Sequence, residues 1–321
     1  MYYYIQMDST SSSQYENIVT ATLSDILVPG ISKIVLGFLC HEKIIVVSNY
    51  HGIVVRIRNG SVVLCGDIKD TCLCSYVLND VDSIYSTDHA FAAKRYGGIV
   101  VTWGDAIEGG DSSSVQAELK NGVDTIYSTE QAFAAKLLDG RVVTWGNPRF
   151  GGDSSSVQAE LKKGVDTIYS TGFAFAAKMA DGSVVVWGDS RFGGDISSVQ
   201  AELKKGVDTI YSTGSAFAAK LTDGSVATWG GSRFGGDSSS VQSELKNKVD
   251  TIYSNDWAFA AKKKDRSIVT WGRASCGGDS SSVQAELKKG VDTIYSTDNM
   301  FVAKLLDGSL VTWCKKYQKV L

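Results

Sequence analysis

An aspartate beside two glycines recurs along the chain, in the segment Gly-Gly-Asp-Ser-Ser-Ser or a close variant of it. Its copies place carboxylates at Asp111, Asp153, Asp195, Asp237 and Asp279. Such loops can hold calcium, but that ion takes about six to eight oxygen ligands, and one carboxylate per copy makes a poor cage. The segment also lacks the lysine of a phosphate-binding loop. We therefore expect these aspartates to cap helices or turns.

Other residues that could carry out catalysis or bind a metal are few. The histidines are His41, His51 and His89, and the cysteines stand at positions 40, 65, 72, 74, 276 and 314. The cysteines do not recur at equivalent places in the repeat described below, which favours reduced thiols in a cytosolic protein. Cysteine and histidine spacing does not match a zinc finger, and the serine runs do not form a nucleophile elbow. We expect a protein that is not an enzyme and that binds no metal or cofactor.

Composition excludes further classes of protein. Of the 321 residues, 43% are hydrophobic and 21% are charged, which suffices for a large core and argues against disorder. The net charge of -3 provides no basic field that would attract nucleic acid or anionic lipid. No apolar run approaches the roughly 18 to 20 residues of a membrane span, and the first residues lack the pattern of a secretory signal. We expect a cytoplasmic, monomeric protein.

Tryptophan marks a tandem repeat of 42 residues. The members of the series are Trp103, Trp145, Trp187, Trp229, Trp271 and Trp313. A degenerate seventh copy comes first, because Lys43–Gly66 aligns with Val123–Gly146 and puts Cys65 in the tryptophan place. A second register with Ile31–Gly37 as the inner strand also fits, but the first alignment keeps all three strands of the copy. Repeats of this length indicate a stacked array rather than two ordinary domains.

Each copy predicts three strands and a short helical segment. The runs DTIYST, AFAAKL and SVVTW are rich in residues that favour strands. An Asp-Gly pair such as Asp139-Gly140 joins the second run to the third, which predicts a two-residue type I′ hairpin. Ser113 and Gln116 then have the spacing of a capping box, and Gly122 stands where a two-turn helix would end.

Stacked copies of such a unit predict an all-β, seven-bladed β-propeller. One small sheet cannot bury both its faces, whereas neighbouring blades cover them and a closed ring protects the sheet edges. Capping repeats of an open solenoid are not visible in the sequence. We assign 43–321 to the propeller and expect the segment 1–42 to close the ring.

Positions that differ between the copies cluster in two places. They are the pair after the first strand and the loop after the third, which emerge on the same face of an up-and-down blade. Arginine and aromatic residues at these positions are typical of protein–protein hot spots. We predict a partner-binding face formed by His51, Asp88, His89, Glu130, Gln131, Arg149, Phe150, Phe173, Arg191, Phe192, Arg233, Phe234, Asp256, Trp257, Asp298 and Asn299.

The repeated run VDTIYSTxxAFAAKxxDGSVVTWG resembles the repeat of the regulator of chromosome condensation family. The resemblance spans residues 43–314 and implies a seven-bladed propeller. It differs from that family in its shorter units, in a helical segment that replaces a fourth strand, and in the lack of a wedge insertion and a basic tail. Shortened repeats of this kind occur in bacteria, and some intracellular bacteria deliver family members into host cells to act on Ran-type small GTPases.

These observations predict a protein-binding scaffold, and the resemblance implies a small GTPase of the Ran type as its partner and a role as a delivered effector. Three alternatives stay open. The first is guanine-nucleotide exchange, which the missing wedge disfavours. The second is a glycan- or small-ligand-binding propeller, which would require identical side chains in every copy. The third is a purely structural module.

Overall fold

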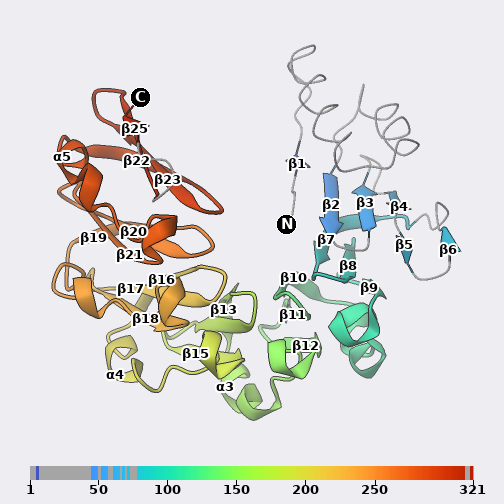
Figure 1. Ribbon diagram of the computed structural model, residues 1–321. Helices are drawn as coiled ribbons and strands as arrows, with labels where there is room; N and C mark the ends of the chain where they lie inside the picture. Colours follow the sequence, from blue (N-terminus) through green and yellow to red (C-terminus); the bar gives the residue numbers. More distant parts are fainter. Residues whose placement is uncertain are drawn as a thin grey trace. The chain divides into compact units, whose positions relative to one another are not determined.

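A computed structural model describes residues 5–6, 45–49, 52–56, 61–65, 67–68, 71–72, 78–314 and 319–320 (Figure 1). The chain divides into two compact units, Met1–Ile126 and Tyr127–Leu321, and each is treated by itself below. Seven of its sheets have three or four antiparallel strands, and short helical segments follow five of them. The all-β propeller fold that the sequence predicts is confirmed.

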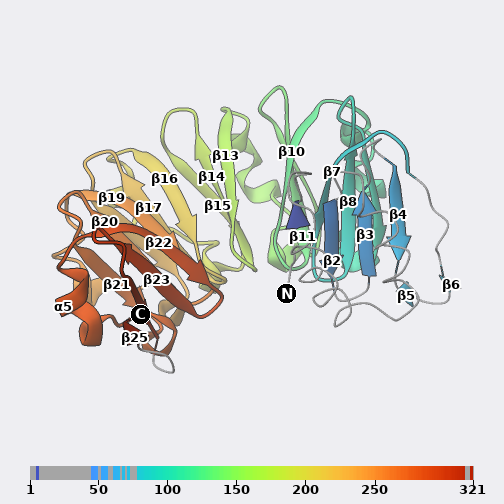
Figure 2. The same cartoon turned by 90° about the horizontal axis from the view of Figure 1, so that it is seen from above.

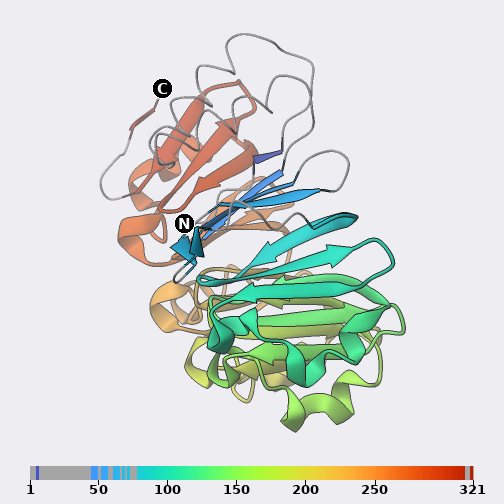
Figure 3. The same ribbon diagram turned by 90° about the vertical axis from the view of Figure 1, so that its right-hand side faces the viewer.

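The first unit contains two blades and a small hairpin. The strands are β1 (Ile5–Gln6), β2 (Ile45–Asn49), β3 (Gly52–Arg56), β4 (Val62–Cys65), β5 (Asp67–Ile68), β6 (Thr71–Cys72), β7 (Val81–Ser86), β8 (Ala90–Arg95) and β9 (Val100–Gly104). Helical turns follow at η1 (Ala106–Gly110), η2 (Ser113–Val115) and η3 (Glu118–Lys120), before β10 (Val123–Ser128). Strands β7, β8 and β9 lie side by side in one sheet (Figure 3).

The second unit repeats the same blade. Its strands are β11 (Ala132–Leu137), β12 (Val142–Gly146), β13 (Val165–Ser170), β14 (Ala174–Met179), β15 (Val184–Gly188), β16 (Val207–Ser212), β17 (Ala216–Leu221), β18 (Val226–Gly230), β19 (Val249–Ser254), β20 (Ala258–Lys263), β21 (Ile268–Gly272), β22 (Val291–Thr297), β23 (Met300–Leu305), β24 (Leu310–Trp313) and β25 (Lys319–Val320). The one-turn α-helices are α3 (Gln158–Leu161), α4 (Gln200–Leu203) and α5 (Gln284–Leu287), and they lie at the outer edge of their blades (Figure 1).

The degenerate first copy forms a blade in the preferred alignment. Ile53 pairs with Cys65 across β3 and β4, as Phe133 pairs with Trp145 across β11 and β12. The competing inner strand, Ile31–Gly37, lies outside the described residues. So does the rest of the segment 1–42 except β1, which pairs antiparallel with β2 through Ile5 and Val46.

The hairpin between the second and third strands differs from the predicted type I′ turn. Gly140 has a φ of +82°, whereas the φ of Asp139 is not positive. The Gly140 N–H donates to the Leu137 carbonyl at 2.9 Å, and the Leu137 N–H donates to that of Arg141 at 2.8 Å. The prediction was wrong because a type I′ turn needs positive φ at both central residues. A longer turn that ends on one left-handed glycine connects the strands instead.

The helical segment is also shorter than predicted. In the third copy η5 (Ser155–Val157) leads into the single turn of α3. The predicted capping box in the second copy is wrong, because Asp111 Oδ1 accepts from the Ser113 N–H at 2.8 Å and no cap bond is formed by Ser113 and Gln116. The buried Ser112 hydroxyl instead bonds the Gln116 side chain at 3.2 Å. The aspartates of the Gly-Gly-Asp segment are therefore turn caps, as expected.

Neighbouring blades of the second unit stack face to face, and their cores fill the space between sheets (Figure 2). Ala132 and Ala134 of β11 pack in one cluster with Phe175 and Trp187 of the next blade. Alanines on the second strand let the sheets approach closely, because larger side chains would hold them apart. The helical turn adds Leu161, which is fully buried in the same cluster. The residues that the copies share therefore build the frame.

Candidate protein-binding face

The turn after the first strand and the loop after the third strand meet at one end of each blade. In the third copy the Thr129 hydroxyl donates to the Phe150 carbonyl at 3.0 Å, and the Asn147 N–H donates to the Gln131 carbonyl at 2.9 Å. The threonine bond recurs from Thr171 to Phe192 at 3.1 Å. These turns and loops are called the variable face below, and their shared position follows the prediction.

A row of backbone hydrogen bonds joins the turns of successive blades. The Glu130 N–H donates to the Gly172 carbonyl at 2.9 Å, and the Gly172 N–H donates to that of Gly214 at 2.9 Å. The Gly214 N–H continues the row to the Asp256 carbonyl at 3.0 Å. This row was not predicted from the sequence, because the residue pattern of the strands does not indicate which turns 42 residues apart are in contact. It fixes the spacing of the turns on the variable face.

Aromatic side chains form contacts across the blade boundaries on this face. Phe173 lies between Phe150 of the preceding blade, with ring centroids 5.3 Å apart, and Phe192 of its own blade, at 4.7 Å. Two blades further, Phe234 stacks on Trp257 at 4.8 Å. All five rings are half-buried. They therefore keep an exposed surface while their positions are held by neighbours.

Arg149 and Arg191 share one carboxylate. Asp189 Oδ2 accepts from Arg149 Nε at 3.1 Å and from Arg191 Nη2 at 2.8 Å. The hydrogen bond from the Arg191 side chain holds the pKa of Asp189 well below its usual range. Asp189 is only 7% exposed, whereas the arginine side chains are 66% and 61% exposed. The two guanidinium groups are thus positioned but still accessible.

The next two blades lack this carboxylate. Gly231 and then Arg273 occupy the place of Asp189 in the repeat. Arg233 and Arg273 are exposed and form no ion pair with any residue that the structure describes. Arg273 instead lies over the Trp257 ring, with its guanidinium carbon 4.4 Å from the centroid. The predicted face leaves out Asp189 and Arg273, although both stand in the loop after the third strand, whose residues vary between the copies.

Carboxylates line the first-strand turns. Partial desolvation raises the pKa of the Asp256 carboxyl, and the charge of Asp298 adds to the rise. The Glu130 side chain lies against Gly172, since a Cβ there would stand 2.5 Å from its Oε1. Asn299 is exposed, and its Oδ1 lies 3.8 Å from the Cys276 sulfur. Gln131 accepts from Asn147 Nδ2 at 2.7 Å.

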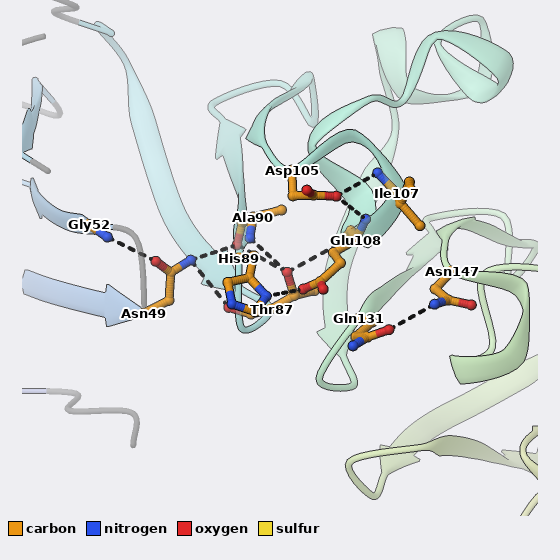
Figure 4. A network of polar contacts seen from close by, with 10 residues as sticks. All are labelled: Asn49, Gly52, Thr87, His89, Ala90, Asp105, Ile107, Glu108, Gln131 and Asn147. Carbon is orange, nitrogen blue, oxygen red and sulfur yellow. Dashed lines mark hydrogen bonds and ion pairs between the residues drawn. The ribbon is translucent and has the colours of Figure 1, made fainter. Parts of the chain in front are cut away.

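In the first unit, His89 and Glu108 occupy the repeat positions of Phe173 and Phe150. His89 Nδ1 lies 2.5 Å from Glu108 Oε2, and Thr87 Oγ1 donates to the Glu108 carbonyl at 3.1 Å (Figure 4). Asp88 beside them is half-buried. The His89 ring is therefore held by a carboxylate of the loop that follows its own blade. His51 lies outside the described residues.

Within the described ranges no group of three or more His, Cys, Asp or Glu side chains could hold a metal ion. Cys276 and Cys314 are buried. None of the helices described is long and apolar enough to cross a membrane.

No protein-family model and no curated protein matches the chain. Solved structures similar to it include the ectodomain of the receptor kinase CR4 from Physcomitrella patens, with 15% identity, a TM-score of 0.46, and coverage of 84% of this chain and 72% of that one. Yeast RCC1 (Prp20) bound to Kap60 has 14% identity, a TM-score of 0.45, and coverage of 73% and 70%. Human WBSCR16 has 16% identity, a TM-score of 0.46, and coverage of 70% and 75%. Identities this low say nothing about function.

Proposed function

We propose that the chain is a non-enzymatic, protein-binding propeller scaffold, and that its variable face binds the partner. The observation that carries the proposal is the set of accessible arginine and aromatic side chains on the second unit, most of which are held by a hydrogen bond, an ion pair or a ring contact. Arg191 is fixed by Asp189, and the Trp257 ring contacts both the Phe234 ring and the Arg273 guanidinium. Side chains ordered before binding lose less entropy when a partner arrives.

The family resemblance makes a Ran-type small GTPase the first protein to test as the partner. The bonds from Thr129 and Thr171 to the loops support a rigid surface for such a protein. Exchange activity is a separate question, and release of labelled nucleotide from the GTPase measures it directly. Binding without faster release would support a scaffold and exclude an exchange factor.

The proposal is tested by affinity capture with two matched variants. The first, W257A/R191A/R233A, removes one aromatic ring and two cations from the variable face. The control, L138A/K162A/K204A, removes one exposed apolar side chain and two cations elsewhere in the same unit. Leu138 lies in the hairpin between the second and third strands, at the opposite end of its blade from the variable face.

We expect the first variant to lose a partner that the wild type and the control both capture. Equal recovery of every partner by all three proteins would refute a binding role for this face. Because each variant removes exposed or half-buried side chains, unchanged thermal unfolding serves as the check that both are folded.

A further inference from the structure

The arginines of the variable face differ in how their charge is balanced. Arg149 and Arg191 flank the single carboxylate of Asp189. Gly231 removes that carboxylate in the next copy, so Arg233 forms no ion pair with any described residue. Arg273 replaces it with a second cation in the copy after that. Arg233 and Arg273 therefore lack the paired carboxylate that Asp189 provides for Arg149 and Arg191.

One of these arginines contacts an aromatic pair, and the other adjoins that pair in the sequence. Arg233 directly precedes Phe234, whose ring stacks on Trp257 at 4.8 Å with an interplanar angle of 18°. Arg273 lies over the Trp257 ring at 4.4 Å. A guanidinium that lies over an aromatic ring still has N–H groups that can form paired hydrogen bonds with a carboxylate. The guanidinium groups therefore provide hydrogen-bond donors for an anion beside an apolar aromatic surface.

From this juxtaposition we infer that Arg233, Phe234, Trp257 and Arg273 form an anion subsite that binds an acidic segment of the partner protein. The inference rests on the proposed function and adds the chemistry of the partner. Aspartate or glutamate carboxylates accept from the two guanidinium groups, and the aliphatic part of the segment lies on Phe234 and Trp257.

Charge on the rest of the face favours a peptide over a nucleic acid. Asp256 and Asp298 stand in the neighbouring turns and are close enough for Asp298 to raise the pKa of Asp256. A strand of regularly spaced phosphates would bring like charges against these carboxylates, whereas an acidic peptide can place its charges at the arginines alone. The net charge of -3 also means that the protein as a whole does not attract a polyanion such as nucleic acid.

The chain itself supplies the substitutions for a test. G231D copies the arrangement of the preceding blade, where Asp189 has nearly the same backbone angles (φ -68°, ψ 118°) as Gly231 (φ -62°, ψ 116°). D189G makes the opposite change, and the turn Ser232–Phe234 shows that a glycine at this place still permits the same helical turn. The first change should neutralise Arg233, and the second should free Arg149 and Arg191.

The probe is a fluorescein-labelled hexaglutamate peptide, with hexaglutamine as the uncharged control, and anisotropy is measured at low ionic strength. We expect the wild type to bind hexaglutamate only, G231D to bind it about tenfold more weakly, and D189G to bind it more tightly, where tenfold corresponds to about 1.4 kcal/mol. R233Q/R273Q removes the charges without adding atoms at Gly231, where a Cβ would lie 3.0 Å from Phe234. It should weaken binding as G231D does.

Three results would overturn the inference: equal binding of the two peptides, unchanged affinity in both G231D and R233Q/R273Q, or tighter binding of single-stranded DNA than of hexaglutamate. A different result would refute the proposed function, namely equal capture of the partner by W257A/R191A/R233A and by its control. If that variant loses the partner but the wild type does not bind hexaglutamate, the variable face is the binding surface and the inference that it binds an acidic segment is wrong.

Discussion

The indole Nε1 of Trp187 donates to the carbonyl oxygen of Gly151 at 3.0 Å, and this bond ties one blade to the loop that ends the preceding one. The same bond joins Trp229 to Gly193 at 3.1 Å. Each tryptophan also stacks on a phenylalanine of its own blade, as Trp187 does on Phe175 at 5.2 Å. The most regular residue of the sequence therefore holds neighbouring blades together.

Replacing Trp187 with phenylalanine should destabilise the protein. The change leaves the Gly151 carbonyl without its indole donor and leaves part of a well-filled core empty, so we expect a loss of about 2–4 kcal/mol in the free energy of unfolding. Denaturant unfolding measures it. Trp257→Phe is the matched control, since Trp257 belongs to the variable face, and it should change stability by less than about 1 kcal/mol. Equal losses in the two variants would contradict an inter-blade role for Trp187.

Gly193 should tolerate a methyl group less well than Gly164. Both have positive φ, at +117° and +109°, but a Cβ on Gly193 would stand 2.5 Å from the fully buried Phe217 ring, and a Cβ on Gly164 would meet nothing within 4 Å. Overpacking costs about 1–3 kcal/mol. The melting temperature of Gly193→Ala should therefore fall below that of Gly164→Ala, because backbone strain is common to both. Equal melting temperatures would show that the Phe217 contact is easily relieved.

Much of the blade could be predicted from the sequence, because strand runs and the tryptophan interval depend on local pattern. The errors came from backbone geometry. Leu138 extends the hairpin, so Asp139 need not adopt positive φ, and the Asp-Gly signal indicated too short a turn. The capping box failed because Asp111, one residue outside the serine run, accepts the Ser113 N–H first. The pattern of hydrophobic residues indicates neither the length of the hairpin turn nor the residue that caps the helical segment.

The charge of Asp189 should contribute stability at neutral pH and lose that contribution in acid. Its pKa in the folded chain is lowered, so the contribution is complete above the ordinary aspartate pKa near about 3.9 and declines as the pH falls toward the folded value. Asp189→Asn is the comparison, since Asn147 shows that an amide fits this turn and caps it. The difference in unfolding free energy between wild type and variant should shrink below pH ~4. A difference that stays constant with pH would indicate that the ion pairs add no stability.

The row of bonds between the turns should slow amide exchange. The N–H groups of Glu130, Gly172 and Gly214 donate to the next turn, whereas the exposed Asp256 only accepts. Hydrogen exchange resolved by residue should find the first three protected by a factor of about ten or more relative to Asp256. Rapid exchange at Gly172 and Gly214 would mean that the turns move independently.

The binding face was predictable only in part. Positions that break the repeat pointed to Arg191, Phe173 and Trp257 without any structure. The role of Asp189 was not predicted, because it depends on two arginines from different blades that are far apart in the sequence. The role of Arg273 was not predicted either, because its significance comes from the Trp257 ring beneath it.

The central claim is that residues shared by the copies build the frame and that residues breaking the repeat bind the partner. Isothermal titration of the captured partner against wild type, W257A/R191A/R233A and L138A/K162A/K204A tests it most directly. Hot-spot side chains contribute about 2 kcal/mol or more each, so the first variant should bind at least about a hundredfold more weakly. The control should bind within about threefold of the wild type. Equal affinity of all three proteins, or a loss confined to the control, would contradict the claim.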